Sequence, residues 1–316
     1  LAAWRPLRPW AARVLRARLS KKAPPQHYPA PHRLLELWQH RATAEQEARS
    51  LGELLVSPTG RNLTQLFLRG EARKRAARAV PHSIEWVHVV GAGTMGADIA
   101  LWAAQRGFRV SLQDRHPEAL ARALKRAHEF CKKRQREPRA VQEVMDRLMP
   151  DLAGNGLKRA DLVIEAIIED LDAKQALFRE IEQKAKPQAL LATNTSSIPL
   201  EDLGKALADP ARLVGLHFFN PVAKMQLIEI VRGALTSEAA LARARAFAVA
   251  LDRLPLDVAS RPGFLVNRVL MPYLLEAVRM VEEGIAPTRV DAAVRDFGMP
   301  IGPIELADTV GLDICL

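Results

Sequence analysis

The chain has 316 residues and a formal net charge of +10, and 48% of its residues are hydrophobic, 26% charged and 5% aromatic. This length predicts two domains, and the apolar share provides sizeable cores, which excludes disorder for most of the chain. The longest stretch without charges, residues 187–200, is short and partly polar, so we expect no membrane span, which requires about 20 apolar residues. Cys131 and Cys315 are far apart, which excludes a disulfide scaffold and a thiolate zinc site and fits a reducing compartment.

The positive charge is concentrated at the start of the chain. Residues 1–82 hold 16 basic and 5 acidic residues, a net charge of +11. Residues 83–316 hold the other 30 basic and 31 acidic residues, a net charge of −1. The Arg-rich stretch 1–22 is compatible with a mitochondrial transit peptide, a nucleic-acid-binding patch or a solvated basic helix between domains. We favour the solvated helix and expect no nucleic-acid partner. Because the chain starts with Leu1 and not Met, we expect it to be an excised fragment.

Residues 1–82 are expected to form a basic, proline-containing connector between domains. The proline-rich stretch 23–31 predicts an extended linker rather than core, because proline fixes φ and lacks a backbone donor. Short amphipathic helices are predicted by apolar residues at helical spacing: Leu34, Leu35, Leu37, Trp38, Leu51, Leu54, Leu55, Leu63, Leu66 and Phe67. The block is too interrupted to form a core alone, so we expect it to pack on another part of the protein.

Residues 83–261 alternate strand and helix patterns. The expected strands are 86–90, 108–112, 162–167, 189–193 and 213–217, with 226–231 as an edge strand, and helices are expected from about Met95, Pro117 and Asp172. Such alternation predicts an α/β fold, a Rossmann-type doubly wound sheet with right-handed crossovers. From residue 262 to 316 the apolar period becomes helical, which predicts the beginning of an all-α domain.

A glycine-rich loop, Gly91-Ala92-Gly93-Thr94-Met95-Gly96, directly follows the first expected strand and opens a helix. Gly91 allows the tight turn, Gly93 lets backbone amides approach a pyrophosphate, and Gly96 lets the helix pack closely on the strand. Asp114 ends the next strand, where a carboxylate accepts hydrogen bonds from the adenosine ribose and repels a 2′-phosphate. The loop therefore predicts dinucleotide binding, with NAD favoured over NADP.

A histidine and a glutamate point to acid–base chemistry at the carboxyl edge of the sheet. His217 ends a buried strand, Glu229 stands among apolar residues twelve positions later, and the polar run 194–197 ends another strand. Ligands of open α/β sheets bind at this edge. A buried glutamate needs a partner, and the histidine can be that partner. The residues alone leave open whether His217 is catalytic or a satisfied core residue.

The sequence resembles L-3-hydroxyacyl-CoA dehydrogenases, specifically the dehydrogenase part of the multifunctional β-oxidation protein. The resemblance runs from about residue 84 to the end and lies in the glycine loop, 163–166 with Glu169, 194–197, 217–221, Glu229, 262–268 and 297–303. Residues 1–82 resemble the connector that follows the enoyl-CoA hydratase domain in that family. The resemblance implies NAD-dependent oxidation of a 3-hydroxyacyl-CoA to a 3-oxoacyl-CoA.

The resemblance also implies roles for individual residues. His217 would take the hydroxyl proton while C3 passes hydride to the nicotinamide, and Glu229 would hold the histidine in the required tautomer. Ser196 and Asn220 would contact the reacting oxygen or orient substrate and nicotinamide, with Ser196 also on the cofactor side. Asn267 would close the site from the second domain.

Two further family positions, Glu169 and Lys174, would lie near the nicotinamide-side ribose. Two plainer interpretations stay open: Ser196 caps the following turn, and Lys174 is a solvated helix residue. Basic residues that could meet the phosphates of coenzyme A, or simply form a solvated face, are Lys125, Arg126, Lys132, Lys133 and Arg134.

The resemblance implies an acyl-CoA substrate, an enoyl-CoA hydratase domain upstream in the parent chain and a thiolase subunit as partner. Because the family continues beyond the equivalent of Leu316, we expect the fragment to bind NAD with poor or no turnover. The alternatives are a non-catalytic NAD-binding or assembly module and a hydroxy-acid dehydrogenase of the same architecture. The composition favours the bacterial cytoplasm over mitochondria or peroxisomes.

Overall fold

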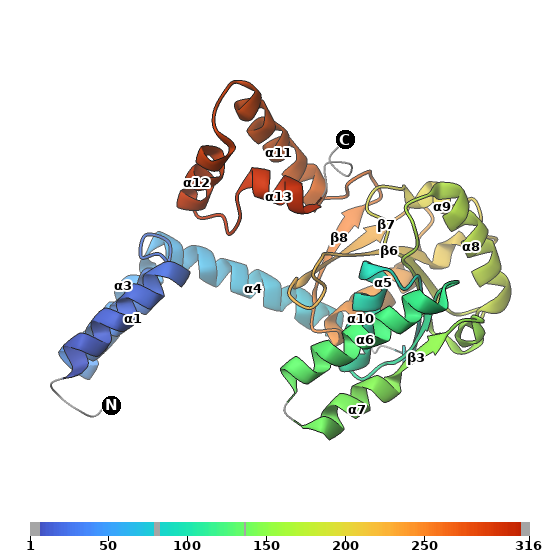
Figure 1. Ribbon diagram of the computed structural model, residues 1–316, viewed down its shortest axis with the longest axis horizontal. Helices are drawn as coiled ribbons and strands as arrows, with labels where there is room; N and C mark the ends of the chain where they lie inside the picture. Colours follow the sequence, from blue (N-terminus) through green and yellow to red (C-terminus); the bar gives the residue numbers. More distant parts are fainter. Residues whose placement is uncertain (1–6, 79–82, 136, 311–316) are drawn as a thin grey trace. The chain divides into compact units, whose positions relative to one another are not determined.

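The computed structural model describes residues 7–78, 83–135 and 137–310. It divides into two compact units, one formed by residues 1–72 with 283–311 and the other mainly by residues 73–282 (Figure 1). The second unit contains the sheet and the glycine loop and is called the sheet unit below. The first is called the helical unit.

An eight-stranded sheet forms the centre of the sheet unit. Its strands are β1 (Trp86–Val90), β2 (Arg109–Gln113), β3 (Leu148–Asp151), β4 (Leu162–Glu165), β5 (Leu190–Thr193), β6 (Leu213–Phe218), β7 (Leu227–Arg232) and β8 (Leu254–Ala259). The spatial order is β3-β2-β1-β4-β5-β6-β7-β8; β1 to β6 are parallel, whereas β7 is antiparallel to β6 and β8 is parallel to β7. The order reverses at β1 and β4, which is the doubly wound arrangement, so the predicted Rossmann-type fold is confirmed.

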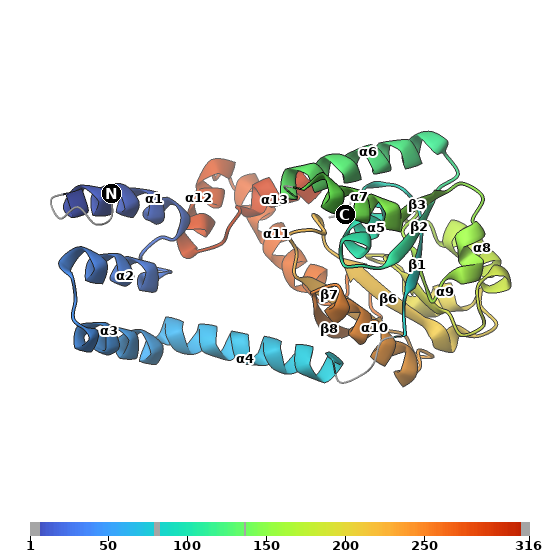
Figure 2. The same ribbon diagram turned by 90° about the horizontal axis from the view of Figure 1, so that it is seen from below.

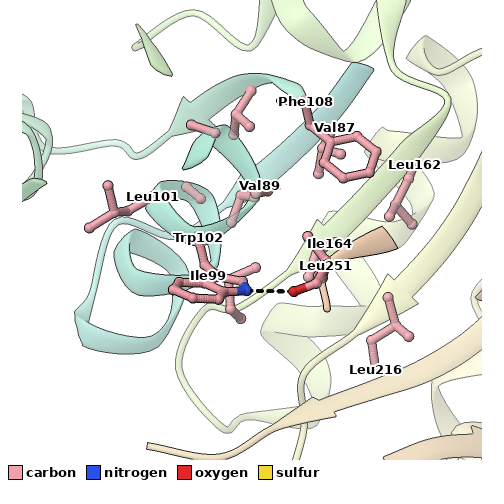
Figure 3. Packing of buried hydrophobic residues seen from close by; sticks show 14 of the residues in the cluster. Val87, Val89, Ile99, Leu101, Trp102, Phe108, Leu162, Ile164, Leu216 and Leu251 are labelled. Carbon is pink, nitrogen blue, oxygen red and sulfur yellow. Dashed lines mark hydrogen bonds between the residues drawn. The ribbon is translucent and has the colours of Figure 1, made fainter. Parts of the chain in front are cut away.

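Helices cover both faces of this sheet. They are α5 (Thr94–Gln105), α6 (Pro117–Arg134), α7 (Pro138–Arg147), α8 (Leu171–Lys184), α9 (Leu200–Gly204) and α10 (Glu238–Ala250), with 3₁₀ turns at Asn155–Arg159 and Pro210–Arg212. One buried cluster joins the strands to α5, α6, α7 and α10, and a second joins them to α8 and α9. Figure 1 shows α6 and α8 on opposite sides of the strands. Trp102 lies in the first cluster and donates its indole N–H to the Leu251 carbonyl at 2.9 Å (Figure 3).

The expected edge strand 226–231 is not at the edge. Its counterpart β7 pairs with β6 on one side and with β8 on the other. The two true edge strands, β3 and β8, have no counterpart among the predicted strands. Each contains a proline, Pro150 or Pro255, and each is only partly buried, so neither shows the apolar run of a central strand. Proline is tolerated at sheet edges because its missing donor leaves no inner hydrogen bond unmade.

The helical unit contains α1 (Arg8–Lys22), α2 (Pro29–His40), α3 (Ala44–Val56), α12 (Pro287–Phe297), α13 (Pro303–Val310) and most of α4 (Pro58–Arg78). Helices α1, α2 and α3 lie one against the next (Figure 2). The stretch 23–31, predicted as an extended linker, is instead a short turn followed by the first residues of α2. Proline fits the first helical turn, where the backbone N–H has no partner in any case. His27 in this turn bonds the Asp296 carbonyl at 3.0 Å, which ties the connector to α12.

The first helix after the sheet, α11 (Val266–Glu282), belongs to the sheet unit. It begins directly behind the turn that carries Gly263 and Phe264, and both residues have positive φ angles. The helices in the described part of the chain are too short or too polar to span a membrane.

Candidate active site

The glycine loop has the backbone geometry that its sequence predicts. Gly91 has φ +106°, and a Cβ there would lie 2.4 Å from the Ala166 carbonyl oxygen. A Cβ on Gly96 would lie 1.9 Å from the Gly91 carbonyl oxygen, so both positions require glycine. Gly93 is the N-cap of α5, and no described atom lies within 4 Å of the place its Cβ would take. The loop is therefore closed against the sheet at Gly91 and Gly96 and open at Gly93.

This loop fits a dinucleotide pyrophosphate. Among the described residues, no side chain caps α5 and no acidic residue stands in its first turn, so the amides there face outward with a partial positive charge. Asp114 fixes the loop: one carboxylate oxygen accepts from the Ala92 N–H at 2.7 Å and the other from His116 N–H at 2.9 Å. Thr94 is exposed and Met95 packs against the core. The loop thus offers bare amides at Gly93 and a fixed carboxylate beside them.

His217 and Glu229 form a buried pair across two strands. They stand directly opposite each other in the antiparallel register of β6 and β7, and Nδ1 of His217 lies 2.7 Å from Oε2 of Glu229. His217 is 6% exposed and Glu229 is fully buried. The imidazole packs edge-on against Phe219 and Phe264, with ring centroids at 4.6 Å and 5.4 Å. The pair has the arrangement of a histidine oriented by a carboxylate.

Glu229 has a second set of partners at the start of α11. Its Oε1 accepts hydrogen bonds from Leu265 N–H at 3.0 Å and Val266 N–H at 2.8 Å. Burial by itself would raise the pKa of Glu229, but the hydrogen bonds from His217, Val266 and Leu265 outweigh it and lower the pKa. The carboxylate therefore stays ionised beside the imidazole. Asn267 follows in the first turn of α11 and is half-buried.

The loop after β6 carries Asn220 at the same edge. Asn220 is exposed and precedes a cis peptide bond to Pro221. Asn194, at the end of β5, accepts the Phe218 N–H at 2.9 Å and so joins the ends of the two strands. The carboxyl edge of the sheet thus brings together the histidine pair and the polar run 194–197, as the strand order predicts.

The turn that contains Ser196 is held by a carboxylate. Oε1 of Glu169 accepts from Ser196 N–H at 3.0 Å and Ser197 N–H at 3.2 Å, and it also accepts from the Thr195 hydroxyl. The cap of this turn is Thr195, whose Oγ1 accepts from Ile198 N–H at 3.0 Å. The interpretation of Ser196 as the capping side chain is therefore wrong.

Lys174 is not a solvated helix residue either. It is 1% exposed, and its Nζ lies 2.6 Å from Glu165 Oε1 and 3.1 Å from Glu169 Oε2. Burial requires these ion pairs, because an ammonium leaves water only when its charge is compensated. The expected residues Glu169, Lys174 and Ser196 therefore lie in one connected group at the ends of β4 and β5.

Comparison with known proteins places this arrangement in a family. Residues 86–261 match the model of the 3-hydroxyacyl-CoA dehydrogenase NAD binding domain, and residues 263–316 match that of the 3-hydroxyacyl-CoA dehydrogenase C-terminal domain. The chain belongs to the 3-hydroxyacyl-CoA dehydrogenase family. These two matches confirm the predicted family, the dehydrogenase class and the NAD-binding domain.

Individual relatives agree with this family. The fatty acid oxidation complex subunits alpha of Pseudomonas entomophila and Pseudomonas putida are each 36% identical over 300 residues, which cover 91% of this chain and 42% of theirs. The chain thus spans less than half the length of these curated relatives. Among solved structures, Mycobacterium tuberculosis FadB2 is 39% identical, with a TM-score of 0.71 over 73% of this chain and 84% of that one. The 3-hydroxybutyryl-CoA dehydrogenase of Escherichia coli K12 is 40% identical, with a TM-score of 0.70 over 74% of this chain and 51% of that one.

The basic side chains suggested for coenzyme A phosphates in this family member lie on α6 and are exposed: Lys125, Arg126, Lys132, Lys133 and Arg134. Two of them have partners within the protein. Arg126 contacts Asp98 at 3.3 Å, and Arg134 lies over the rings of Phe130 and Trp102 at 5.4 Å and 5.7 Å. Phosphate binding by this face stays a prediction.

Sequence reasoning missed a buried arginine behind the Asn220 loop. Arg253 is 4% exposed, stacks on Trp102 with its guanidinium carbon 3.9 Å from the ring centroid, and donates to the Val222 carbonyl at 2.8 Å. Burial, with repulsion from Arg106, lowers the pKa of Arg253 to about 10. An arginine immediately before a strand carries no motif, so the sequence offered no signal for it.

Proposed function

We propose that this protein oxidises an L-3-hydroxyacyl-CoA to the 3-oxoacyl-CoA with NAD. The observation that carries the proposal is the His217–Glu229 pair at 2.7 Å, at the same sheet edge as the open glycine loop. NAD, when bound, supplies the acceptor for the hydride that leaves C3 of the substrate. Residues 83–261 would hold it, with residues 262–316 as part of the helical domain and residues 1–82 as the connector.

Side chains of the protein would accept the proton of the substrate hydroxyl group. Glu229 keeps Nδ1 of His217 protonated, so Nε2 accepts the proton of the 3-hydroxyl group as the C3–H bond breaks. The nearby carboxylate then stabilises the imidazolium that forms. Ser196 and Asn220 would orient the reacting oxygen and the nicotinamide, and Asn267 would complete the site from α11.

On the cofactor side, residues 91–96 would hold the pyrophosphate through the amides at the start of α5, and Asp114 would hold the adenosine ribose. Glu169 and Lys174 would lie at the nicotinamide-side ribose. The carboxylate of Asp114 is fixed by two backbone amides, which supports NAD over NADP because a 2′-phosphate would meet a carboxylate that cannot move away.

The relatives named as subunits alpha of a fatty acid oxidation complex support a place in β-oxidation. We propose that the substrate comes from an enoyl-CoA hydratase domain upstream in a longer parent chain and that the product passes to a thiolase subunit. A bacterial cytoplasmic location goes with this proposal.

The test follows NADH oxidation by acetoacetyl-CoA at stoichiometric enzyme concentration, with NADH binding measured separately by fluorescence. We expect oxidation that depends on the CoA ester and that His217→Gln lowers by about 10²- to 10⁴-fold, the usual worth of a general acid–base, with NADH binding intact. Oxidation without a CoA ester, oxidation insensitive to His217→Gln, or absence of oxidation in a longer parent chain would overturn the proposal.

A further inference from the structure

A buried ionic triplet lies at the carboxyl ends of β4 and β5, and the proton transfer described above does not use it. It consists of Glu165, Lys174 and Glu169. Glu165 ends β4 and is fully buried, Lys174 comes from the first turn of α8, and the Glu169 side chain is 37% exposed. The ammonium of Lys174 thus bridges an inner and an outer carboxylate.

Glu165 is held rigidly. Its Oε1 accepts from Lys174 Nζ at 2.6 Å and from Ile167 N–H at 2.8 Å, and its Oε2 accepts from the Thr193 hydroxyl at 2.6 Å. A buried ion pair is weak evidence for stability, because desolvation of both charges opposes their attraction. The triplet is therefore better explained by what it does at the site.

The charges of the triplet do not cancel. Two carboxylates face one ammonium, so the group carries a formal charge of −1. Burial would raise the pKa of Glu169, but Lys174 and the hydrogen bonds from Thr195 and Ser196 outweigh it and lower the pKa, so this carboxylate stays ionised. The excess negative charge is held at the edge where the cofactor binds in the proposed function. The nicotinamide ring is cationic in NAD⁺ and neutral in NADH.

We infer that Glu165 is a positioning residue that, through Lys174 and Glu169, biases the site toward the oxidised cofactor. This inference rests on the proposed function, in which Glu169 and Lys174 lie at the nicotinamide-side ribose. A fixed negative charge binds a cation more tightly than its neutral counterpart, so the triplet lowers the Kd of NAD⁺ relative to that of NADH. In the oxidative direction this keeps the cofactor bound before hydride transfer and eases its release afterwards.

The variant that isolates this effect is Glu165→Gln. The amide keeps the shape and one carbonyl acceptor for Lys174, and the Thr193 hydroxyl can accept from its NH₂ group instead of donating. We expect the Kd ratio of NAD⁺ to NADH to rise by about two- to tenfold, the range for one charge across a partly solvated site. The Kd of NADH, from fluorescence titration, should change less than that of NAD⁺, from calorimetry.

The control variant is Glu182→Gln, in the last turn of α8, the helix that also carries Lys174. Like Glu165, Glu182 accepts hydrogen bonds from the backbone and pairs with a cationic side chain; its partners are the Ala208 and Asp209 amides and Arg212, away from the cofactor edge. Its Kd ratio should stay that of the wild type. If Glu165→Gln does not fold, Glu169→Gln removes one charge of the same triplet from a half-exposed position and should raise the ratio in the same direction.

The two proposals fail in different ways. A wild-type protein that binds neither NAD⁺ nor NADH overturns the proposed function and the inference with it. A wild-type protein that binds both, with a ratio unchanged in Glu165→Gln, or in Glu169→Gln where the first variant does not fold, overturns the inference alone. Equal weakening of both cofactors also overturns it, because that is the result of a purely structural role.

Discussion

Helices α5 and α3 have similar lengths and carry apolar residues, yet they differ in what they cover. Helix α5 in the sheet unit buries eight of its twelve residues, whereas none of the thirteen described residues of α3 in the helical unit is buried. The sheet provides a broad apolar surface on which α5 to α10 pack. The difference shows that an apolar helical pattern predicts a helix, whereas its burial depends on a partner surface.

The largest expected contrast is in core packing. Phe247→Ala in α10 removes a fully buried ring that meets Phe108 edge-on at 5.1 Å, and should lower the free energy of unfolding by about 3–5 kcal/mol. Phe67→Ala in α4 removes a ring that is 66% exposed and should change it by less than about 0.5 kcal/mol. Urea unfolding followed by circular dichroism measures both. Equal losses in the two variants would contradict the contrast between the units.

A matched pair of glycine substitutions sharpens the same comparison. Gly96→Ala places a methyl group against the Gly91 carbonyl, so we expect a loss of about 1–3 kcal/mol and weaker NADH binding. Gly70→Ala, in α4, meets no described atom within 4 Å and should stabilise the helix by up to about 1 kcal/mol. Thermal unfolding with an NADH titration distinguishes them. Unimpaired NADH binding by Gly96→Ala would show that the close contact is dispensable.

The smallest expected effect concerns pH. His88 is fully buried in β1, where its ring nitrogens contact Ser111 and Gln113. Burial lowers the pKa of His88 below 6.5, although the Gln113 hydrogen bond and Asp151 oppose this. The unfolded chain therefore binds more protons at mildly acidic pH, and the free energy of unfolding should fall as pH drops below about 6.5.

The check is a set of urea midpoints between pH 7.5 and 5. His88→Gln should flatten this dependence, whereas His128→Gln, at an exposed position on α6, should leave it as in the wild type. A steep decline that persists in His88→Gln would assign the pH effect to other groups.

The geometry of the candidate site was largely predictable from sequence, because strand ends and glycine spacing are local signals. The glycine loop follows from the requirement for glycine at positions 91 and 96, and the pairing of His217 with Glu229 follows from the need of a buried glutamate for a partner. Fewer of the supporting features could be foreseen. The sequence does not distinguish Lys174 from a solvated helical lysine. Its pairing with Glu165 depends on how α8 packs on β4, which the sequence pattern does not give.

The fold was predictable where strands are fully buried and less predictable at the edges of the sheet and at the ends of helices. The central strands β1, β4, β5 and β6 are almost wholly buried, whereas β3 and β8 are partly exposed and contain prolines. The start of α2 was missed for a related reason: proline predicts a break inside a helix but is favourable in its first turn, and the sequence pattern does not separate these two positions.

The two oxygens of Glu229 are divided between the imidazole and the backbone at the start of α11. A single side chain therefore ties the tautomer of the histidine to the seating of the helix that carries Asn267. If that helix were displaced, the carboxylate would lose its amide donors and its hold on the ring would loosen as well. In the proposed reaction, correct seating of α11 on the sheet would therefore be a precondition for proton transfer.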